Sequence, residues 1–388
     1  SYSSYPQGPP MTPYTYHIPT EITLAPGCLA TLGAKCAHLG EKPFVVTGRN
    51  AARATGLLDR ILMLLPNAEL FDAIPENPGT AICAEGAARC AMAGCDVVVA
   101  AGGGSALDAA KAIAMLARNG GAADDYFGSE LFQDGALPLI AIPTTAGTGS
   151  EVTPYAVLVD VAGASKRTVA GKALFPRYAL LDPELSVTLP RDVTVATGLD
   201  ALSQAMEGML SKKATPIGDA LALEVCRVLR HALPLAANAP GNLDARAAML
   251  HAAMLSGIVI AHSGTTLVHG MGYYFTLRYG IAHGVANALL LPPVFRHNAR
   301  HAPAKVAALA EALDATGDDP GNAIAAALHT LFNELHFSPA GRDWGVQEED
   351  LEAFARDIHA DSYRFKNQLG EFTVPEVEAL FREACFGR

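Results

Sequence analysis

Residues 97–111 read VVVAAGGGSALDAAK, and this stretch decides the fold class. A β-branched apolar run is typical of a buried strand, and Gly102, Gly103, Gly104 and Ser105 lead from it directly into a helical pattern. Glycine lacks Cβ, so the backbone can approach a ligand, and the start of the helix offers free N–H groups to a phosphate. Because a full GxGxxG pattern is absent, two interpretations stay open: a pyrophosphate cradle, or an ordinary tight turn.

A second loop of the same kind is IPTTAGTGSEVT at 142–153. Thr144, Thr145, Thr148 and Ser150 surround two glycines directly after a predicted strand. Their hydroxyls can bond a nucleotide, or they can satisfy the turn's own backbone. Two such loops after strands favour a nucleotide site, because ligands of open α/β sheets bind at the carboxyl ends of the strands.

The rest of the chain divides into two halves. Short strand-like runs alternate with alanine-rich helical patterns up to the DPEL motif at 182–185, which predicts a Rossmann-like parallel sheet covered by helices. Long apolar helical patterns follow to the end, with Pro216, Pro234, Pro240, Pro292 and Pro303 as predicted helix starts or stops. We predict a disordered leader at 1–10, an α/β dinucleotide-binding domain at 11–190 and an all-helical metal and substrate domain at 191–388. The predicted strands are 44–47, 97–100, 139–142, 157–160 and 179–181.

The composition excludes several classes of protein. A formal net charge of -11 argues against a nucleic-acid partner, since binding phosphates needs a surplus of Lys and Arg. Half of the 388 residues are hydrophobic, yet polar residues, glycine or proline interrupt every apolar run before about 18 residues, so we expect no membrane span. The seven cysteines contain no CxxC pair, and the first residues do not resemble a signal peptide. A reducing, cytoplasmic location is therefore expected.

The helical half contains a cluster of polar residues within apolar sequence. Asp200 and Gln204 are four residues apart and so share one helix face, and His269 and His283 follow downstream. A carboxylate, an amide oxygen and two imidazoles suit Fe²⁺ or Zn²⁺, and such a metal polarises a carbonyl or alkoxide. The alternative is that all four are hydrogen-bonded core residues.

Together these motifs resemble the iron-containing, or group III, alcohol dehydrogenase family. The resemblance runs from about residue 17 to the C-terminus. It implies a dehydroquinate synthase-like architecture, with a nucleotide-binding α/β domain, an all-helical domain and the active site in the cleft between them. The motifs occur in the family's order: PENP at 75–78, GGGSALDAAK at 102–111, PTTAGTGSEVT at 143–153, Lys166 before LFPRYALLDPEL, GLDALSQAMEG at 198–208 and HGMGYYFTLRYGIAHG at 269–284.

The resemblance also implies the roles of individual residues. The pyrophosphate would lie on Gly102, Gly103, Gly104 and Ser105, and the rest of the dinucleotide would be lined by Asn77, Asp108, Thr144, Thr145, Thr148 and Lys166. Asp200, His269 and His283 match three of the family's four metal ligands. The fourth is usually histidine but is Gln204 here, which puts metal affinity and metal identity in question.

Two further positions depart from the family pattern. Many members carry a second histidine four residues after His269, where this chain has Tyr273, a candidate to relay the proton or to pack against the nicotinamide. After the first strand, NAD-preferring members commonly carry an acidic residue, where this chain has Gly48 followed by Arg49. Losing the acid and gaining a guanidinium favours NADP, or use of both NADP and NAD.

The predicted function is an NAD(P)-dependent alcohol dehydrogenase or aldehyde reductase, with hydride transfer to or from a carbonyl carbon and Tyr273 and His283 as catalytic residues. One alternative is a metal-independent reductase of an acidic carbonyl substrate, as in the maleylacetate reductases. Another is a cofactor-binding protein whose catalysis has decayed. We expect a small-molecule alcohol or aldehyde as substrate and a homodimer, and the sequence does not identify the substrate.

Overall fold

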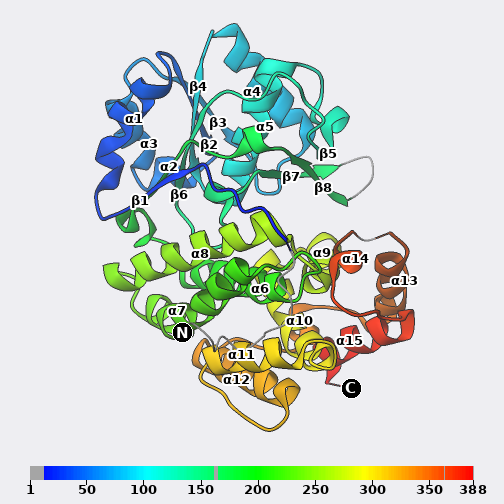
Figure 1. Cartoon of the computed structure of the whole chain (residues 1–388). Helices are drawn as coiled ribbons and strands as arrows, with labels where there is room; N and C mark the ends of the chain where they lie inside the picture. Colours follow the sequence, from blue (N-terminus) through cyan, green and yellow to red (C-terminus); the bar gives the residue numbers. More distant parts are fainter. Residues whose placement is uncertain (1–12, 161–164, 362, 388) are drawn as a thin grey trace, which may run out of the picture.

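The computed structural model describes residues 13–160, 165–361 and 363–387, so the predicted leader at 1–10 lies outside the described residues. Figure 1 shows an α/β part and a helical part, one above the other. All described strands end before residue 182, and helices follow from residue 191. This order agrees with the predicted architecture, while the exact domain boundary stays a prediction.

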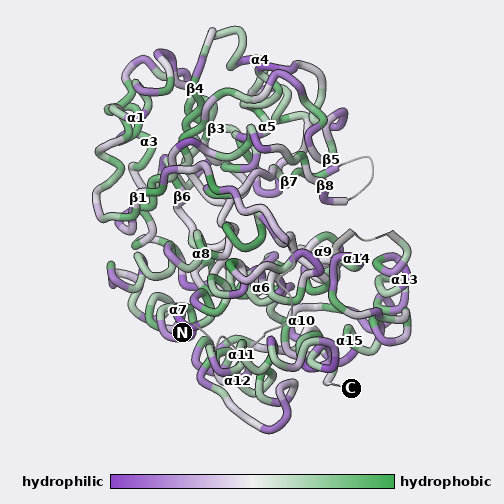
Figure 2. The backbone as a smooth tube through the Cα atoms, in the orientation of Figure 1, coloured by the Kyte–Doolittle hydropathy of each residue, from purple (hydrophilic) through white to green (hydrophobic). Residues whose placement is uncertain are grey.

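The central sheet is six-stranded and parallel, in the order β1-β9-β6-β4-β2-β3. Its middle strands are almost completely buried and mainly apolar, as expected where helices cover both faces. Figure 2 shows these strands as hydrophobic and the outlying helix α13 (Leu351–Asp361) as largely hydrophilic. The strands are β1 (Glu21–Leu24), β2 (Pro43–Gly48), β3 (Glu69–Ile74), β4 (Val97–Gly102), β6 (Leu139–Pro143) and β9 (Tyr178–Leu181).

Alternate side chains of each strand enter two separate cores. Val45 and Val99 pack with α1 (Leu32–Leu39) and α3 (Leu57–Leu64), and a short helix, α2 (Ala51–Ala54), lies between them in sequence. Phe44 and Val98 pack on the opposite face with α4 (Thr80–Met92) and α5 (Gly104–Asn119). The period-two alternation of a strand thus fixes which helices cover which face.

A second, three-stranded sheet contains β5 (Gly128–Ser129), β7 (Tyr155–Asp160) and β8 (Ser165–Ala170). The strand predicted at 157–160 belongs here, where β7 pairs antiparallel with β8, so its expected place in the parallel sheet is wrong. Strands β1, β3, β5 and β8 were not predicted. Charged or polar residues interrupt their apolar patterns, because these strands lie at sheet edges or face solvent.

The helical part has a single large core formed by most of its helices. Helix α8 is, within the described residues, the one helix long and apolar enough to cross a membrane, and 72% of its most apolar window is buried. It packs against α6 and α7, as a core helix does. The helices are α6 (Arg191–Met209), α7 (Pro216–Asn238), α8 (Leu243–Ser263), α9 (Leu267–Tyr279), α10 (His283–Asn298), α11 (Pro303–Ala312), α12 (Pro320–Glu334), α13 (Leu351–Asp361), α14 (Tyr363–Asn367) and α15 (Val374–Phe386).

Some of the prolines predicted to start or stop a helix do so, and others lie inside a helix. Pro216 and Pro303 occupy the first helical positions of α7 and α11, as predicted. Pro234 lies inside α7 and Pro292 inside α10, so the predicted breaks there are wrong. Both helices bury apolar side chains on either side of these prolines, and that packing offsets the lost backbone hydrogen bond.

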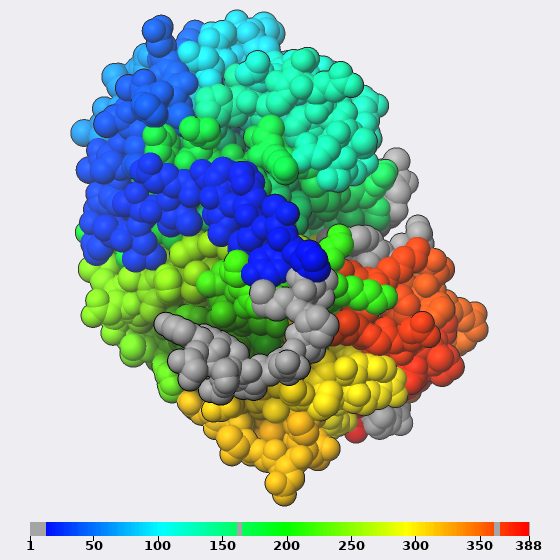
Figure 3. All heavy atoms as spheres, viewed as in Figure 1, coloured from blue at the N-terminus to red at the C-terminus, as the bar shows by residue number. Residues whose placement is uncertain are grey.

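Several contacts join the two parts, among them one ring stack, one hydrogen bond and one close approach of two backbones. In Figure 3 the blue N-terminal segment lies across their boundary, where Tyr16 stacks on His262 of α8 with ring centroids 3.6 Å apart. The Tyr155 hydroxyl of β7 reaches the Ile260 carbonyl of α8, at 2.9 Å. A Cβ on Gly149 would lie 2.4 Å from Gly257 Cα, so the second glycine-rich loop lies directly against the α8 backbone.

Candidate active site

Three of the predicted metal ligands converge, although they come from three helices. Asp200 lies on α6, His269 on α9 and His283 at the start of α10, and one donor atom of each lies within 4.8 Å of the others. Asp200 Oδ1 is 3.4 Å from His269 Nε2 and 3.8 Å from His283 Nε2. Asp200 and His269 are buried, while 24% of the His283 side chain is exposed, so one side of the cluster is open.

Backbone contact between α6 and α10 brings these ligands together. A Cβ on Gly284 would lie 1.7 Å from the Ala196 carbonyl oxygen and 3.1 Å from Asp200 Cβ. Any side chain at 284 would therefore force the helices apart. The glycine after His283 thus sets the separation between this ligand and Asp200.

A second buried carboxylate, Glu207, orients His269. Glu207 Oε2 contacts His269 Nδ1, and Oε1 accepts hydrogen bonds from the Thr266 and His269 backbone N–H groups, both at 3.1 Å. Burial opposes the imidazolium, but the charges of Glu207 and Asp200 outweigh it and raise the His269 pKa to about 9. Sequence reasoning missed Glu207, although it lies seven residues after Asp200 and so on the same helix face.

Two amide side chains border the cluster. The predicted ligand Gln204 donates from Nε2 to Asp200 Oδ2 at 3.2 Å, and its Oε1 accepts from Ser256 Oγ at 2.9 Å. Asn287, which sequence reasoning also missed, is fully buried one helical turn after His283. Its Nδ2 lies 3.1 Å from Asp200 Oδ1 and 3.2 Å from Nε2 of both His269 and His283.

These donors fit a divalent metal. Ligand atoms about 2.1 Å from a tetrahedral Zn²⁺ or Fe²⁺ are about 3.4 Å apart, close to the two separations from Asp200 Oδ1. A carboxylate behind an imidazole, as Glu207 is behind His269, is the usual outer support of such a ligand. Burial raises the pKa of Asp200, but His283 and His269 outweigh it and hold that pKa below its ordinary value, so the ligand stays charged.

Tyr273, a predicted catalytic residue, lies at the open side of the cluster. Its ring stacks on His283 with centroids 4.8 Å apart and an interplanar angle of 20°. Lys166 Nζ, from β8 of the α/β part, lies 5.4 Å from the centre of the same ring. A predicted cofactor residue and a predicted catalytic residue therefore meet where the two parts of the molecule face each other.

Most predicted nucleotide-binding residues gather around the start of α5. This helix begins at Gly104, directly after β4, and a Cβ on Gly104 would lie 2.6 Å from Thr148 Cγ2. The Asn77 backbone N–H donates to Ser105 Oγ at 3.2 Å. The two glycine-containing loops are therefore in contact. Further members of this group are Gly102, whose carbonyl accepts from the Thr144 N–H at 2.9 Å, and Gly103, beside Thr145.

Asp108 has structural contacts that were not expected. Its Oδ1 accepts from Ser150 Oγ at 2.6 Å and its Oδ2 from the Val157 N–H at 3.0 Å. The buried Lys111 ammonium donates to Ser150 Oγ, at 2.8 Å. Asp108 and Lys111 thus hold the second loop in position, and direct contact of Asp108 with the cofactor stays a prediction.

Gly48 and Arg49 follow β2 at the same sheet edge as Gly102, since Thr47 pairs in register with Ala101. Arg49 is exposed, and its Nε donates to the Ala73 carbonyl at 3.1 Å. A Cβ on Gly48 would lie 3.7 Å from the Ile74 carbonyl oxygen, which is an ordinary contact.

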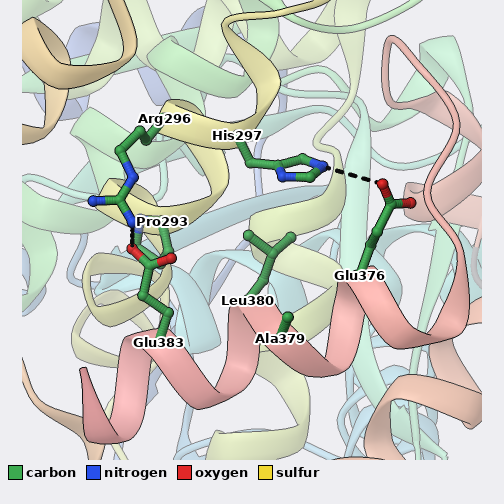
Figure 4. A pocket seen from close by; sticks show the side chains of 7 residues that line it. All are labelled: Pro293, Arg296, His297, Glu376, Ala379, Leu380 and Glu383. Carbon is green, nitrogen blue, oxygen red and sulfur yellow. Dashed lines mark hydrogen bonds and ion pairs between the residues drawn. The ribbon is translucent and has the colours of Figure 1, made fainter. Parts of the chain in front are cut away.

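A surface pocket of about 310 Å³ lies between the other end of α10 and α15 (Figure 4). Arg296 pairs there with Glu383, and His297 Nε2 is 3.8 Å from Glu376. At about 1.5 Å rise per residue, His297 is roughly 20 Å along the helix from His283. This pocket is therefore separate from the candidate active site.

A parallel sheet with glycine-lined strand ends, facing helices that carry a carboxylate and two imidazoles, has the arrangement expected of a nucleotide-dependent oxidoreductase with a metal site. The family "Iron-containing alcohol dehydrogenase" matches residues 19–183, and "Fe-containing alcohol dehydrogenase family, C-terminal" matches 194–385. The chain belongs to the iron-containing alcohol dehydrogenase family, and it is an oxidoreductase acting on CH–OH groups.

Known relatives cover nearly the whole chain. It is 33% identical to the NAD-dependent methanol dehydrogenase of Bacillus methanolicus over 378 residues, which are 95% of this chain and 99% of that protein. The crystal structure of a 1,3-propanediol oxidoreductase superposes with a TM-score of 0.91 at 31% identity, covering 96% of this chain and 100% of the other. Sulfoacetaldehyde reductase of Bifidobacterium kashiwanohense, solved with NAD⁺, gives 0.86 at 29% identity, with 97% and 100% covered.

Proposed function

We propose that this enzyme interconverts a small primary alcohol and its aldehyde at the cluster formed by Asp200, His269 and His283. The observation that carries the proposal is the convergence of these three donors beside Tyr273 and Lys166, where the helical part meets the α/β part. The names of the relatives, which act on methanol and 1,3-propanediol, support small alcohols as the substrate class.

In the proposed mechanism Asp200, His269 and His283 would hold a divalent metal. When bound, the metal would supply Lewis acidity to the carbonyl or alkoxide oxygen, and the nicotinamide would supply the hydride chemistry. Glu207 holds His269 Nδ1, so that Nε2 faces Asp200 and is the nitrogen that can bind the metal. The Tyr273 hydroxyl passes the proton between the substrate oxygen and solvent, since its ring lies against the exposed face of His283.

For the nucleotide, we propose that Gly103, Gly104 and Ser105 bind the pyrophosphate through backbone N–H groups at the start of α5. Thr145 and Thr148 border the same loop, beside Gly103 and Gly104. Lys166 orients the ribose from β8. At the far end of the nucleotide, Arg49 binds a 2′-phosphate, and the absence of an acid at Gly48 removes the charge that would repel it. We therefore propose NADP as the preferred cofactor, with NAD also used.

Metal analysis combined with a nucleotide assay tests this proposal. Protein purified without chelator is analysed for Fe and Zn, and oxidation of NADPH and NADH is then followed with short aldehydes before and after chelation. We expect about one metal per chain, loss of turnover on chelation and its return with Fe²⁺ or Zn²⁺. Full turnover after exhaustive chelation would instead support the metal-independent reductase, and bound nucleotide without turnover would support a decayed enzyme.

A homodimer in the cytoplasm is proposed on the family resemblance alone. Sedimentation equilibrium of the purified chain measures its mass directly, and a monomeric mass would contradict the dimer.

A further inference from the structure

We propose that Asn287, and not Gln204, supplies the fourth protein ligand of the metal, through its amide oxygen. This inference rests on the proposed metal site formed by Asp200, His269 and His283. It concerns the position at which this chain departs from its family.

Gln204 contacts Asp200 Oδ2, which is not the oxygen that faces the two imidazoles. Its amide nitrogen contacts Oδ2, at 3.2 Å, whereas the oxygen that faces both imidazoles is Oδ1. The other end of the amide is bonded to Ser256 Oγ at 2.9 Å, and Ser256 is fully buried in α8. Rotating the amide by half a turn would exchange its nitrogen and oxygen, but the oxygen would then face Oδ2. Gln204 therefore acts as a positioning residue for Asp200.

The Asn287 amide instead lies near all three of the other ligand atoms, at the fourth vertex of a tetrahedron that they would form around a metal. Its amide atom lies 3.1 Å from Asp200 Oδ1 and 3.2 Å from each imidazole Nε2. The separations of Asp200 Oδ1 from the two imidazoles are 3.4 and 3.8 Å. All five distances are close to the edge of about 3.4 Å expected for a tetrahedron of ligands about 2.1 Å from a metal. His283 and Asn287 are also four residues apart on α10, so they share one face of the helix.

The hydrogen bonds of Asn287 show which amide orientation a cation would favour. Nδ2 carries two hydrogens but faces three polar atoms, Asp200 Oδ1 and the two imidazole Nε2 atoms, so it cannot donate to all three. Among the described residues no donor reaches the buried Asn287 Oδ1. A Cβ on residue 272 would lie only 2.2 Å from this oxygen, so the glycine at 272 leaves the space that it occupies. A cation bound by these three atoms, with both imidazoles unprotonated at Nε2, reverses this preference, because it attracts the amide oxygen and repels the N–H groups. Half a turn of the amide then places Oδ1 at the fourth vertex.

The resulting donor set has two imidazole nitrogens, one carboxylate oxygen and one amide oxygen. It contains one imidazole fewer than the family's pattern, so it is harder and binds Zn²⁺ less selectively relative to Fe²⁺ and Co²⁺. The exposed side of His283, beside Tyr273, stays open for substrate.

Binding of Co²⁺ alone tests the assignment, because its visible absorption reports the number and type of ligands. Affinity is measured by competition with a chromophoric chelator in the full chain, for wild type, Asn287→Asp, Asn287→Ala and Gln204→Ala. Thermal melting shows that each variant is folded.

We expect Asn287→Ala to weaken binding about ten-fold or more and to change the spectrum, while Asn287→Asp, which keeps an oxygen at this vertex, binds as tightly as wild type or more tightly. Gln204→Ala should lower affinity but leave the spectrum unchanged, as a positioning residue does.

Two results would overturn the assignment. If Asn287 acts only as a hydrogen-bond donor to Asp200, a carboxylate at 287 repels that oxygen and Asn287→Asp loses affinity. If Gln204 is the ligand, Gln204→Ala changes the spectrum and Asn287→Ala does not. Wild-type protein that binds no Co²⁺ would refute the metal site itself, which distinguishes failure of the proposed function from failure of this assignment.

Discussion

Glu207 Oε2 lies against His269 Nδ1, so a buried carboxylate on α6 determines which imidazole nitrogen on α9 faces Asp200. The other Glu207 oxygen accepts from Thr266 Oγ1 at 2.8 Å and from two backbone N–H groups. Both oxygens of the carboxylate are thus held by hydrogen-bond partners. Glu207 orients the metal ligand His269 and is not itself a metal ligand.

Glu207→Gln should therefore weaken metal binding about 10- to 100-fold, since an amide is a poorer partner for the imidazole N–H. Zn²⁺ affinity measured by chelator competition checks this. Glu371→Gln, at an exposed glutamate of the same half, is the matched control and should bind Zn²⁺ as wild type does. Equal affinity in both variants would mean that His269 is oriented by its surroundings without Glu207.

Gly149→Ala should destabilise the fold and displace the nucleotide loop. Gly149 has φ +64° and lies directly against the Gly257 backbone, so a methyl group meets both backbone strain and a clash. We expect the free energy of unfolding to fall by about 2–4 kcal/mol and the KM for nucleotide to rise. Urea denaturation and initial rates measure these effects. Gly241→Ala, with open space around its Cβ, should change neither, and an unaffected Gly149→Ala would refute the close contact.

Gly48→Asp should shift the enzyme toward NADH. A side chain fits at 48, because a Cβ there makes only ordinary contacts. The carboxylate would bond the ribose 2′-hydroxyl and repel a 2′-phosphate, and a charge-assisted hydrogen bond is worth about 1.5–3 kcal/mol. The ratio of kcat/KM for NADPH to that for NADH should therefore fall about ten-fold or more. Arg49→Ala should lower the same ratio, whereas Arg60→Ala, at an exposed arginine of α3, should not. A wild-type preference for NADH would contradict the proposal at once.

Tyr273→Phe separates proton relay from packing. The variant keeps the ring that stacks on His283 and lies under Lys166, and it loses only the hydroxyl. If the hydroxyl passes the proton, kcat should drop about 100-fold with little change in the KM for nucleotide. Tyr14→Phe, at an exposed tyrosine, serves as the control. An unchanged kcat in Tyr273→Phe would show that the hydroxyl passes no proton and that Tyr273 acts only by packing.

Glu151→Gln should change how stability depends on pH. Burial raises the Glu151 pKa from 4.5 to about 7, although a backbone hydrogen bond and Lys111 oppose this. Between these two pH values the folded state binds more protons than the unfolded state, so the free energy of unfolding falls as pH rises. The total loss is at most about 3 kcal/mol.

Urea denaturation at pH 5, 6 and 7 should therefore show a flatter profile for Glu151→Gln than for wild type. Burial lowers the pKa of the neighbouring Lys111 to about 8, so its own titration lies mainly above this range. Parallel profiles for the two proteins would show that Glu151 ionises normally in the fold.

The sequence predicted those strands whose burial on both faces shows as a local run of apolar residues. The apolar runs at β2, β4 and β6 are covered on both faces, so each is a continuous hydrophobic stretch followed by glycine or threonine. The pairing of β7 with β8 was missed although the two strands are neighbours in sequence, because the polar and charged residues of β8 gave no apolar pattern typical of a strand. The charged residues of β3 hid that strand for a related reason, since an edge strand is only half buried.

Within the candidate site, Asp200, His269 and His283 were recognisable from the motifs, and the structure brings them together. Glu207 and Asn287 were not, because each lies in an apolar helical stretch and differs from a hydrogen-bonded core residue only through its neighbours from other helices. Helical spacing from Asp200 and His283 was the available signal. Which of these side chains touch depends on how α6, α9 and α10 pack, and no single helix specifies that.

The contact between Gly284 and the Ala196 carbonyl has a mechanical consequence. With main chain pressed on main chain, α6 and α10 have no layer of side chains that could slide or repack, so the spacing of Asp200 and His283 is as stiff as the backbone itself. Movements of the α/β part during nucleotide binding would then leave the spacing of the metal ligands unchanged. Substitutions in the nucleotide loops that alter turnover should accordingly leave the metal affinity unchanged.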